Sequence, residues 1–588
     1  MAVPKLAETA SVRFGGLRAV EGPMTLGQLN IHKWLSRSGA VAYGMQFRRV
    51  RPGPGVGVAD FAEALSVLLT RHEGLRTHYL PDRRQRVVDS GELPLRVLEV
   101  DDTDPADLDR VLDDAVNALP YDPATDLPVS AAVAVADGRV LAGVLRCSHL
   151  AADHKAMVVL GAEVEEMLAD PAARVVGPPR HQPVDQAEAE QRPSMRRRAE
   201  ASLRYWGDRL RRMPPNPLAC PSSRGPGESG LGEPGAGGPG AAAPGPGESC
   251  AAEMVSHAGA AALARIEART SLDRSTIVLA AVLAVLSERT GYSTHTFCAL
   301  SNNRFFDRRL TDYVGTLAIS NLVEVDCLRA TFDELGERVR AGMVRASMNA
   351  LYNAYDLHAI AERVEHERGV AFNYFPPIFN NAANYFRSRP AGDGGPAATP
   401  PTEFTWRPME STPAPLRFDL WRIDEVLVLD GWTGDADRIG RAEVEAVLLA
   451  VERLLVAAAD HDLDGPLMSA AIDLPPVPRG EGWLFVDSCW VRLAEAQQLL
   501  DDVFGPGRAR LFGEVGGRPL VAYVEATEAV GTPEEAHARC LSRLSAHPTA
   551  MAPRHYVLCE GAATDPDEPS SWQRRRVVGR GSGRLAGG

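Results

Sequence analysis

The chain has 588 residues, of which 45% are hydrophobic and 24% charged, and its net charge is −14 at pH 7. This length predicts several domains or lobes with enough chain to bury their own cores. The acidic balance argues against nucleic acid as the main partner, because neutralising phosphates requires a dense surface of lysine and arginine.

The cysteine spacing and the scarcity of lysine further restrict the class of protein. The eight cysteines show no clustered spacing, which predicts neither a zinc site nor a disulfide framework. Only Lys5, Lys33 and Lys155 are lysines among 63 basic residues. The start has no apolar leader, and the longest apolar run, 276–286, is too short to span a bilayer. We therefore expect a cytoplasmic protein without a bound metal.

The predicted elements mix helices and strands along the chain, which indicates an α+β fold. Apolar residues at helical spacing predict helices over 58–71, 155–168, 260–269 and 276–289. Apolar runs predict strands over 138–147, 296–300, 322–326 and 425–429. Asp273 and Ser275 are suited to cap the helix over 276–289, and Gly291 to end it.

Composition shifts divide the chain. Between 214 and 249, nineteen of thirty-six residues are proline or glycine, which is typical of a linker or surface insertion. A second Pro-rich break covers 473–480, and a third such stretch, 388–401, indicates a long loop. The resulting domains are 20–213, 214–252, 253–475 and 480–580.

A single segment places residues able to catalyse a reaction at a position that the predicted elements would hold rigid. The spacing His-x-x-x-Asp occurs at His78, His149 and His181, but a proline interrupts the first and the last. Only His149 lies where a predicted strand passes into a predicted helix, a place where a rigid scaffold presents side chains.

The segment Ser148-His-Leu-Ala-Ala-Asp153-His154 resembles the HHxxxDG motif of nonribosomal peptide synthetase condensation domains, which have the chloramphenicol acetyltransferase-like fold. Four further segments match family motifs in the family's order: Thr25-Leu-Gly-Gln28, Arg71-His-Glu-Gly-Leu-Arg-Thr77, Tyr205-Trp206, and Asn302-Asn-Arg304 with Tyr313-Val-Gly-Thr316 and 321–326. The resemblance covers about 24–460.

This resemblance implies two α+β lobes in a V around a central tunnel. It implies that donor and acceptor reach the tunnel as thioesters on the phosphopantetheine arms of separate carrier proteins, with no cofactor held by the chain itself. His149 matches the central histidine of the motif, so its neutral imidazole would hold the acceptor amine or take its proton. Such general-base help is typically worth ~10²–10⁴-fold in rate.

Asp153 and Arg304 match a structural pair of the family. The resemblance implies that Asp153 pairs with Arg304 and holds the loop, whereas its position alone suits a helix N-cap. Two motif positions differ: Ser148 replaces the first histidine, and His154 replaces a glycine. We expect Ser148 to support the site through its hydroxyl and His154 to narrow the substrate channel.

Other residues are weaker candidates. Asn380 and Asn381 follow a mostly apolar stretch and are candidates for lining the channel. Asp430-Gly-Trp432 is interpreted as a strand end rather than a site.

The last hundred residues have a different character. A strand over 517–524, a helix over 533–544 and a turn and strand over 551–558 resemble the small C-terminal subdomain of adenylation enzymes. That family's catalytic lysine has no counterpart, because no lysine follows Lys155. We predict a non-catalytic segment used for packing or docking, the alternative being an unrelated α+β appendage. The tail, 574–576 and 580–588, is expected to be disordered.

Together these features predict a free-standing condensation enzyme that forms an amide, or less readily an ester, in natural-product biosynthesis. Its partners would be carrier proteins acting in trans and a small amine or alcohol. Because the chain is acidic, carrier docking must use local arginines. Two alternatives stay open: an acyl-CoA-dependent acyltransferase, which would use the same histidine, and a degenerate domain that recruits another protein.

Overall fold

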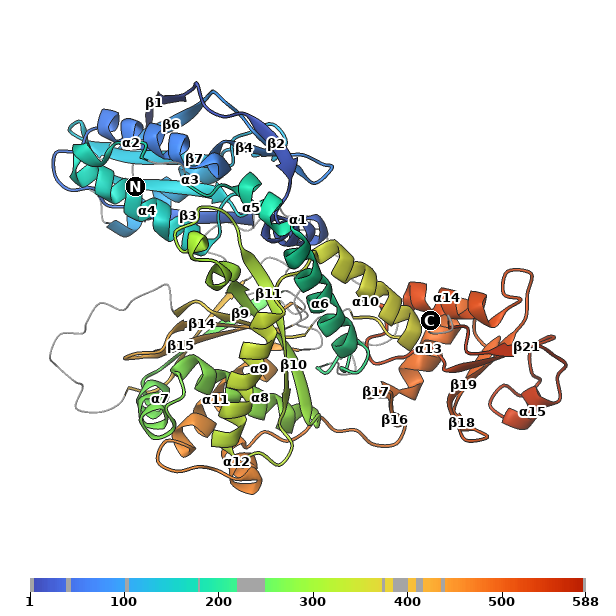
Figure 1. Cartoon of the computed structure of the whole chain (residues 1–588). Helices are drawn as coiled ribbons and strands as arrows, with labels where there is room; N and C mark the ends of the chain where they lie inside the picture. Colours follow the sequence, from blue (N-terminus) through green and yellow to red (C-terminus); the bar gives the residue numbers. More distant parts are fainter. Residues whose placement is uncertain are drawn as a thin grey trace. The chain divides into compact units, whose positions relative to one another are not determined.

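The computed structural model describes residues 5–38, 44–100, 105–177, 180–218, 249–372, 376–383, 400–408, 416–434 and 439–584. Most of the Pro/Gly-rich stretch and of the predicted loop over 388–401 therefore lies outside the described residues. The chain forms two compact units (Figure 1). The first comprises 1–202, 301–319 and 350–356, and the second comprises the rest. The predicted domains follow chain order, whereas these units do not, since two short segments from the second half belong to the first unit.

The first unit contains two sheets and the helices beside them. Its strands are β1 (Lys5–Phe14), β2 (Val20–Pro23), β3 (Met45–Val50), β4 (Thr77–Tyr79), β5 (Arg84–Val87), β6 (Gly91–Glu99), β7 (Val129–Ala136) and β8 (Arg139–Ser148). Its helices are α1 (Leu26–Ser38), α2 (Val58–Arg71), α3 (Pro105–Asn117), α4 (His154–Ala169), α5 (Pro183–Glu190) and the start of α6 (Pro193–Leu210). The predicted strand over 138–147 and the helices over 58–71 and 155–168 are thus present.

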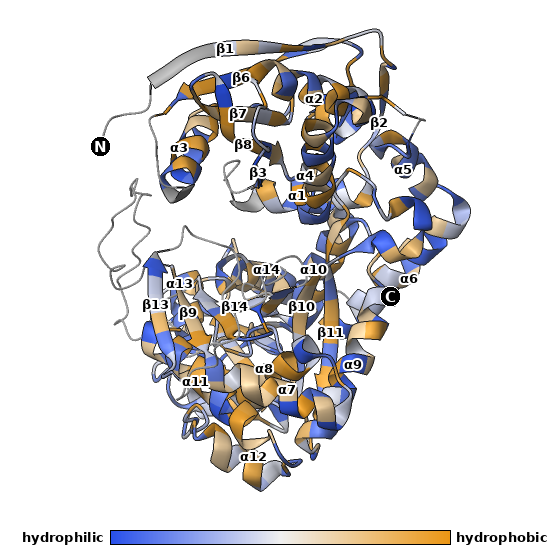
Figure 2. Ribbon diagram, turned by 90° about the vertical axis from the view of Figure 1, so that its left-hand side faces the viewer, coloured by the Kyte–Doolittle hydropathy of each residue, from blue (hydrophilic) through white to orange (hydrophobic). Residues whose placement is uncertain are grey.

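The main sheet of this unit is covered on both faces. Its strand order is β1-β6-β7-β8-β3, with β6 and β7 parallel. Helices α2 and α4 pack on one face through Phe61, Leu65 and Leu160, whereas α3 packs on the other through Leu112 and Val116. Figure 2 shows α3 on one side of β7 and β8 and the other two helices opposite. The carboxyl end of β8 is therefore held between two helical layers.

The second unit is built on a seven-stranded sheet with the order β11-β10-β12-β14-β15-β9-β13. Its strands are β9 (Cys250–Ser256), β10 (Thr294–Asn302), β11 (Ala318–Asp326), β12 (Ile378–Asn381), β13 (Glu403–Pro408), β14 (Leu416–Arg422) and β15 (Leu427–Thr433). Its helices are the end of α6, α7 (His257–Thr270), α8 (Arg274–Thr290), α9 (Phe332–Met348), most of α10 (Ala354–Arg368), α11 (Arg441–Ala457) and α12 (Gly465–Ile472). Asp430-Gly-Trp432 lies inside β15, as a strand segment should.

The sequence around α8 accounts for where this core helix of the second unit begins, ends and is buried. Asp273 caps α8 by accepting a hydrogen bond from the Thr276 amide, and Gly291 ends the helix at φ 68°, a left-handed conformation suited to glycine. The apolar run predicted as a helix is buried between the sheet and its neighbouring helices, from Ile277 to Leu286. Among the described residues, no single helix is long and apolar enough to span a membrane; α7 and α8 meet that criterion only together, and they bend by 106°.

The C-terminal segment also belongs to the second unit. It contains β16 (Trp483–Val486), β17 (Cys489–Arg492), α13 (Leu493–Phe504), β18 (Ala509–Val515), β19 (Arg518–Glu525), α14 (Pro533–Leu544), β20 (His555–Cys559), α15 (Pro569–Gln573) and β21 (Val577–Gly581). The expectation of a disordered tail, given for 574–576 and 580–588, is wrong for 580–581, because β21 pairs with β20 and completes a four-stranded sheet. Residues 585–588 lie outside the described residues.

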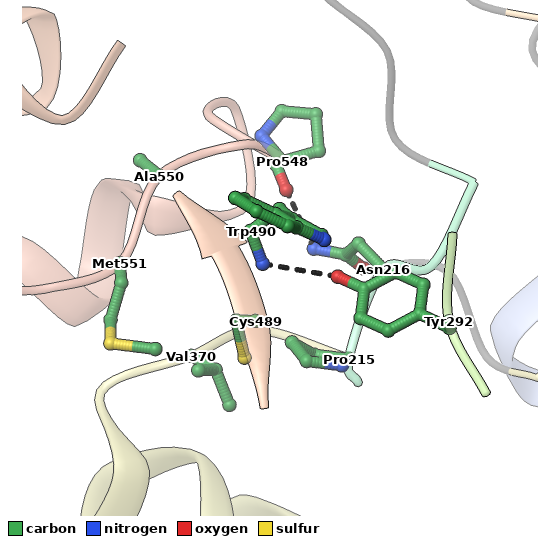
Figure 3. Close-up of a pocket in the computed structure, with 9 residues that line it drawn as sticks. All are labelled: Pro215, Asn216, Tyr292, Val370, Cys489, Trp490, Pro548, Ala550 and Met551. Atoms are coloured by element: carbon green, nitrogen blue, oxygen red, sulfur yellow. Dashed lines mark hydrogen bonds between the residues drawn. The ribbon is translucent and has the colours of Figure 1, made fainter. Parts of the chain in front are cut away.

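Arg368 anchors this segment to the rest of the unit. Its guanidinium is 5% exposed, donates to the carbonyls of Leu210 and Met213 at 2.7 Å, and pairs with the Asp487 carboxylate at 3.1 Å. Figure 3 shows a second set of contacts, in which the Tyr292 hydroxyl accepts from the Trp490 amide at 3.0 Å. The pocket drawn there has room for no more than about one water molecule. These contacts support the prediction of a packing role for the segment.

Candidate active site

The turn after β8 holds His149 in one backbone position. The His149 amide donates to the Gly44 carbonyl, and the amides of Ala151 and Ala152 both donate to the Ser148 carbonyl, at 2.8 and 3.1 Å. Leu150 and the two alanines are buried against the neighbouring core. Because hydrogen bonds hold the backbone on both sides of His149, its side chain extends from a rigid turn.

The His149 ring lies between two side chains from distant segments. Its Nδ1 is 3.5 Å from the Thr316 hydroxyl, and the Trp34 ring meets it edge-on with ring centroids 6.5 Å apart. Burial lowers the pKa of His149, and the Asp153 carboxylate opposes that shift without reversing it. The imidazole is therefore neutral near pH 7 and able to accept a proton.

Helix α1 approaches the Thr316 segment closely because residue 27 is glycine. A Cβ at Gly27 would lie 2.3 Å from the Thr316 carbonyl oxygen, a distance that no real Cβ contact allows. Asn30, one turn later, donates from its side-chain amide to the Ala318 carbonyl at 3.2 Å. The turn after β8, α1 and the segment before β11 thus converge around His149.

The start of α1 explains the first matched motif. The Thr25 amide donates to the Gln28 side-chain oxygen at 2.8 Å, and the Gln28 amide donates to the Thr25 hydroxyl at 3.1 Å. This reciprocal cap satisfies two amides that a helix start leaves unpaired. The motif residues therefore place the helix that carries Trp34.

Asp153 has both of the roles that the sequence suggested for it. Its Oδ1 accepts from the Ala156 amide at 2.9 Å and so caps α4. The same carboxylate makes a bidentate pair with Arg304, at 2.6 and 2.9 Å, and Asp153 is 3% exposed. Arg304 also donates to the Tyr313 carbonyl at 3.0 Å. One buried carboxylate thereby fixes α4 and the 304–317 segment together.

Ser148 and His154 lie on either side of His149 and Asp153 in the sequence. Ser148 is buried, and its hydroxyl oxygen accepts from the Leu150 amide at 3.3 Å, so this side chain braces the turn. His154 is the first residue of α4 and is half-buried. Burial lowers the pKa of His154, and the Asp153 carboxylate opposes that shift, whereas the positive charge of Arg48 adds to it. Both histidines of this loop consequently favour the neutral form.

The second matched motif, 71–77, is a structural network. Arg71 and His72 both reach the Glu163 carboxylate of α4, at 3.1 and 3.0 Å. Arg71 also donates to the Ala173 carbonyl at 2.8 Å. These buried contacts hold the helix whose first turn Asp153 caps, and they place no side chain at His149.

Asn380 and Asn381 belong to the second unit, whereas the residues above belong to the first. The Asn380 amide donates to Asp419 at 2.6 Å across the β12–β14 pair. Asp419 in turn faces Asp430 on β15, and burial raises the pKa of Asp430 to about 6. The predicted channel role of the two asparagines stays a prediction.

Sequence reasoning missed Trp34, Gly27 and the side-chain role of Thr316. Gly27 and Thr316 stand inside matched motifs, but nothing in their spacing shows that they touch. Trp34 follows the first motif by six residues and carries no signal beyond its size. No group of three or more His, Cys, Asp or Glu side chains able to hold a metal occurs in the part of the chain that the structure describes.

Comparisons of sequence identify no relative: no family model matches the chain, and no curated protein matches it. Solved structures do match. A condensation domain that mediates chain release from the enacyloxin polyketide synthase is 19% identical, with a TM-score of 0.54 over 75% of this chain and 83% of that one. SgcC5 from Streptomyces globisporus is also 19% identical, with a TM-score of 0.53 over 75% of this chain and all of the other.

A third match is an X-domain. The X-domain from teicoplanin biosynthesis is 18% identical, with a TM-score of 0.53 over 79% of this chain and 97% of its own, and an X-domain was also solved in complex with OxyB. At these identities the comparison concerns the fold. The chain has the mixed α/β fold of condensation domains and is a condensation-domain-like protein by structure.

Proposed function

We propose that the protein transfers an acyl or aminoacyl group from a carrier-bound thioester to an amine or hydroxyl acceptor, with His149 as the catalytic residue. The observation that carries this proposal is the neutral, rigidly held imidazole at the carboxyl end of β8, in a chain with the condensation-domain fold.

The chemistry needs one base and good positioning. The acceptor nitrogen attacks the thioester carbonyl carbon, the carbon–sulfur bond breaks, and the proton lost by the nitrogen ends on the departing thiolate. His149 takes or orients that proton, and we assign the task to Nε2 because Nδ1 faces Thr316. Asp153 and Arg304 act as positioning residues, since their ion pair fixes the loop that carries His149.

In this proposal the donor arrives on a carrier protein, and the acceptor arrives on a second carrier or as a free small molecule. Holding the two reactants in place can contribute as much as the base, because it turns a bimolecular step into an effectively unimolecular one. No bound cofactor is part of the proposal.

The test compares His149→Ala with His78→Ala. His78 has the same His-x-x-x-Asp spacing and a half-buried ring, but it lies in β4. With acylated carrier protein and candidate amines, we expect product from wild type and His78→Ala and a ~10²–10⁴-fold lower rate from His149→Ala. Equal rates for the three proteins would contradict the role of His149, and no product from wild type with any donor would contradict the function. Acyl-CoA offered as donor in parallel tests the acyl-CoA alternative.

Recruitment of another protein is the second candidate function. The specific observation in its favour is the match to an X-domain that was solved in complex with OxyB. The altered motif positions Ser148 and His154 are compatible with it. A wild-type protein that binds a partner enzyme tightly, with no transfer and no effect of His149→Ala, would select this candidate.

A further inference from the structure

Two adjacent phenylalanines, one of them exposed, lie beside an arginine in the first unit. Phe305 is 59% exposed, and its ring centroid is 4.1 Å from that of Phe306. The Arg198 guanidinium, from α6, stacks over the Phe306 ring at 3.7 Å. Arg308, two residues further along, is exposed. We call these four residues the Phe305 patch.

The arginines of the Phe305 patch have no carboxylate partner among the described residues. Neither Arg198 nor Arg308 forms an ion pair there, whereas the nearby Asp307 is neutralised by Arg309 through three side-chain hydrogen bonds, at 3.1, 3.0 and 2.5 Å. Burial lowers the pKa of Arg198, so its charge is partly desolvated and no carboxylate compensates for it. A partner that brings negative charge would therefore satisfy a cation that the chain leaves unmatched.

The net charge of the chain sharpens this point. At −14, the average surface repels an acidic protein, so an acidic partner must approach through a local positive region. An aromatic side chain surrounded by arginines is also the composition that protein interfaces favour, because the ring supplies buried area and the guanidinium supplies directed hydrogen bonds.

The Phe305 patch is joined directly to the candidate active site. Phe305 follows Arg304, whose guanidinium holds Asp153, and both residues belong to the short 303–306 turn. A partner seated on the patch would therefore rest on the same segment that positions the His149 loop.

Resting on the proposed function, we infer that the Phe305 patch is the docking surface for an acidic carrier protein that delivers a thioester to this site. Phe305 and Phe306 would receive an apolar residue of the carrier, and Arg198 and Arg308 would pair with its carboxylates. The interaction is electrostatic in part, so raising the salt concentration weakens it.

The experiment measures carrier binding and transfer separately. The full-length protein is titrated with a fluorescently labelled, phosphopantetheinylated acidic carrier protein, and anisotropy gives the dissociation constant. Transfer is then followed with the same acyl group on the carrier and, in a second reaction, on free pantetheine. The variants are Phe305→Ser and Arg308→Glu, both at exposed positions where folding is not at risk, together with Arg198→Glu.

Two control variants match the changes elsewhere on the chain. Arg139→Glu makes the same charge reversal at an exposed arginine that forms no ion pair within the described part of the chain. It stands at the far end of β8, roughly 30 Å along the strand from Ser148. Phe485→Ser removes a phenyl ring that is 56% exposed. Both controls keep the binding of wild type if the patch is specific.

The expected result is a loss of carrier affinity of about tenfold or more for Phe305→Ser and Arg308→Glu, with unchanged transfer from free pantetheine. The proposal is overturned if these variants bind the carrier within twofold of wild type, if the controls lose as much, or if wild type does not bind the carrier. If neither the acylated carrier nor acyl pantetheine gives product, but carrier binding still depends on the Phe305 patch, the proposed function is overturned and the docking surface is not.

Discussion

Replacing Arg304 by methionine tests how the His149 loop is held. The change keeps a long apolar side chain but removes the guanidinium that contacts Asp153 at 2.6 and 2.9 Å. Asp153 is 3% exposed, so its carboxylate would be left in a buried position with two backbone amides, those of Ala156 and Leu317, as remaining donors.

The expected cost follows from that burial. Removing one partner of a buried ion pair typically costs about 3–5 kcal/mol, because the other charge stays desolvated without compensation. The exposed pair of Arg309 and Asp307, with side chains 52% and 35% exposed, provides the comparison. The same change there, Arg309→Met, should cost less than about 1 kcal/mol.

Hydrogen exchange followed by mass spectrometry measures the effect locally, which suits a chain with two units that need not unfold together. Peptides covering the first turn of α4 should exchange faster in Arg304→Met than in wild type or Arg309→Met. The double variant Asp153→Asn with Arg304→Met should recover part of the protection, since asparagine still caps a helix and carries no charge. The reasoning is refuted if Arg304→Met costs no more than Arg309→Met, or if the double variant is less protected than the single one.

Four further outcomes are expected. Burial lowers the pKa of His149, so the ring stays neutral at any pH above the ordinary histidine pKa of about 6.5. The value of kcat/KM should therefore be flat from pH 8 to about 7 and fall only at more acidic pH. An acid limb centred above pH 7 would contradict this. Gly27→Ala should lower kcat by displacing Thr316 while α4 keeps its hydrogen-exchange protection; unchanged kinetics would mean that the close approach is not needed. Burial raises the pKa of Glu190 to about 7, so between pH 4.5 and 7 the native state keeps a proton that the unfolded state loses. The free energy of unfolding should therefore fall by about 3 kcal/mol over that range. Thermal melting of Glu190→Gln at several pH values should lack this decrease. Finally, His154→Gly should broaden the range of acyl donors accepted in competition assays, and an unchanged product distribution would remove the channel role of that side chain.

Several features were predictable because they depend on neighbouring residues alone. The cap of α8 by Asp273, its end at Gly291, and the helix Pro533–Leu544 follow from short-range hydrogen bonding and backbone preferences, and each is present. The strand-to-helix position of His149 was predictable for the same reason. The prediction of a disordered tail was wrong for 580–581, because these residues belong to β21, whose pairing with β20 depends on a partner eighteen or more residues away.

The sequence by itself determined the α+β composition, the His149 turn between a strand and a helix, and the dual suitability of Asp153 as cap and ion-pair partner. Only the tertiary structure decided that Trp34 and Thr316 meet the His149 ring, that Gly27 allows this approach, and that Arg198 stacks beside Phe305 and Phe306. The physical reason is that caps and amphipathic spacing are local properties of the backbone, whereas these contacts join segments more than a hundred residues apart and exist only once the first unit has packed.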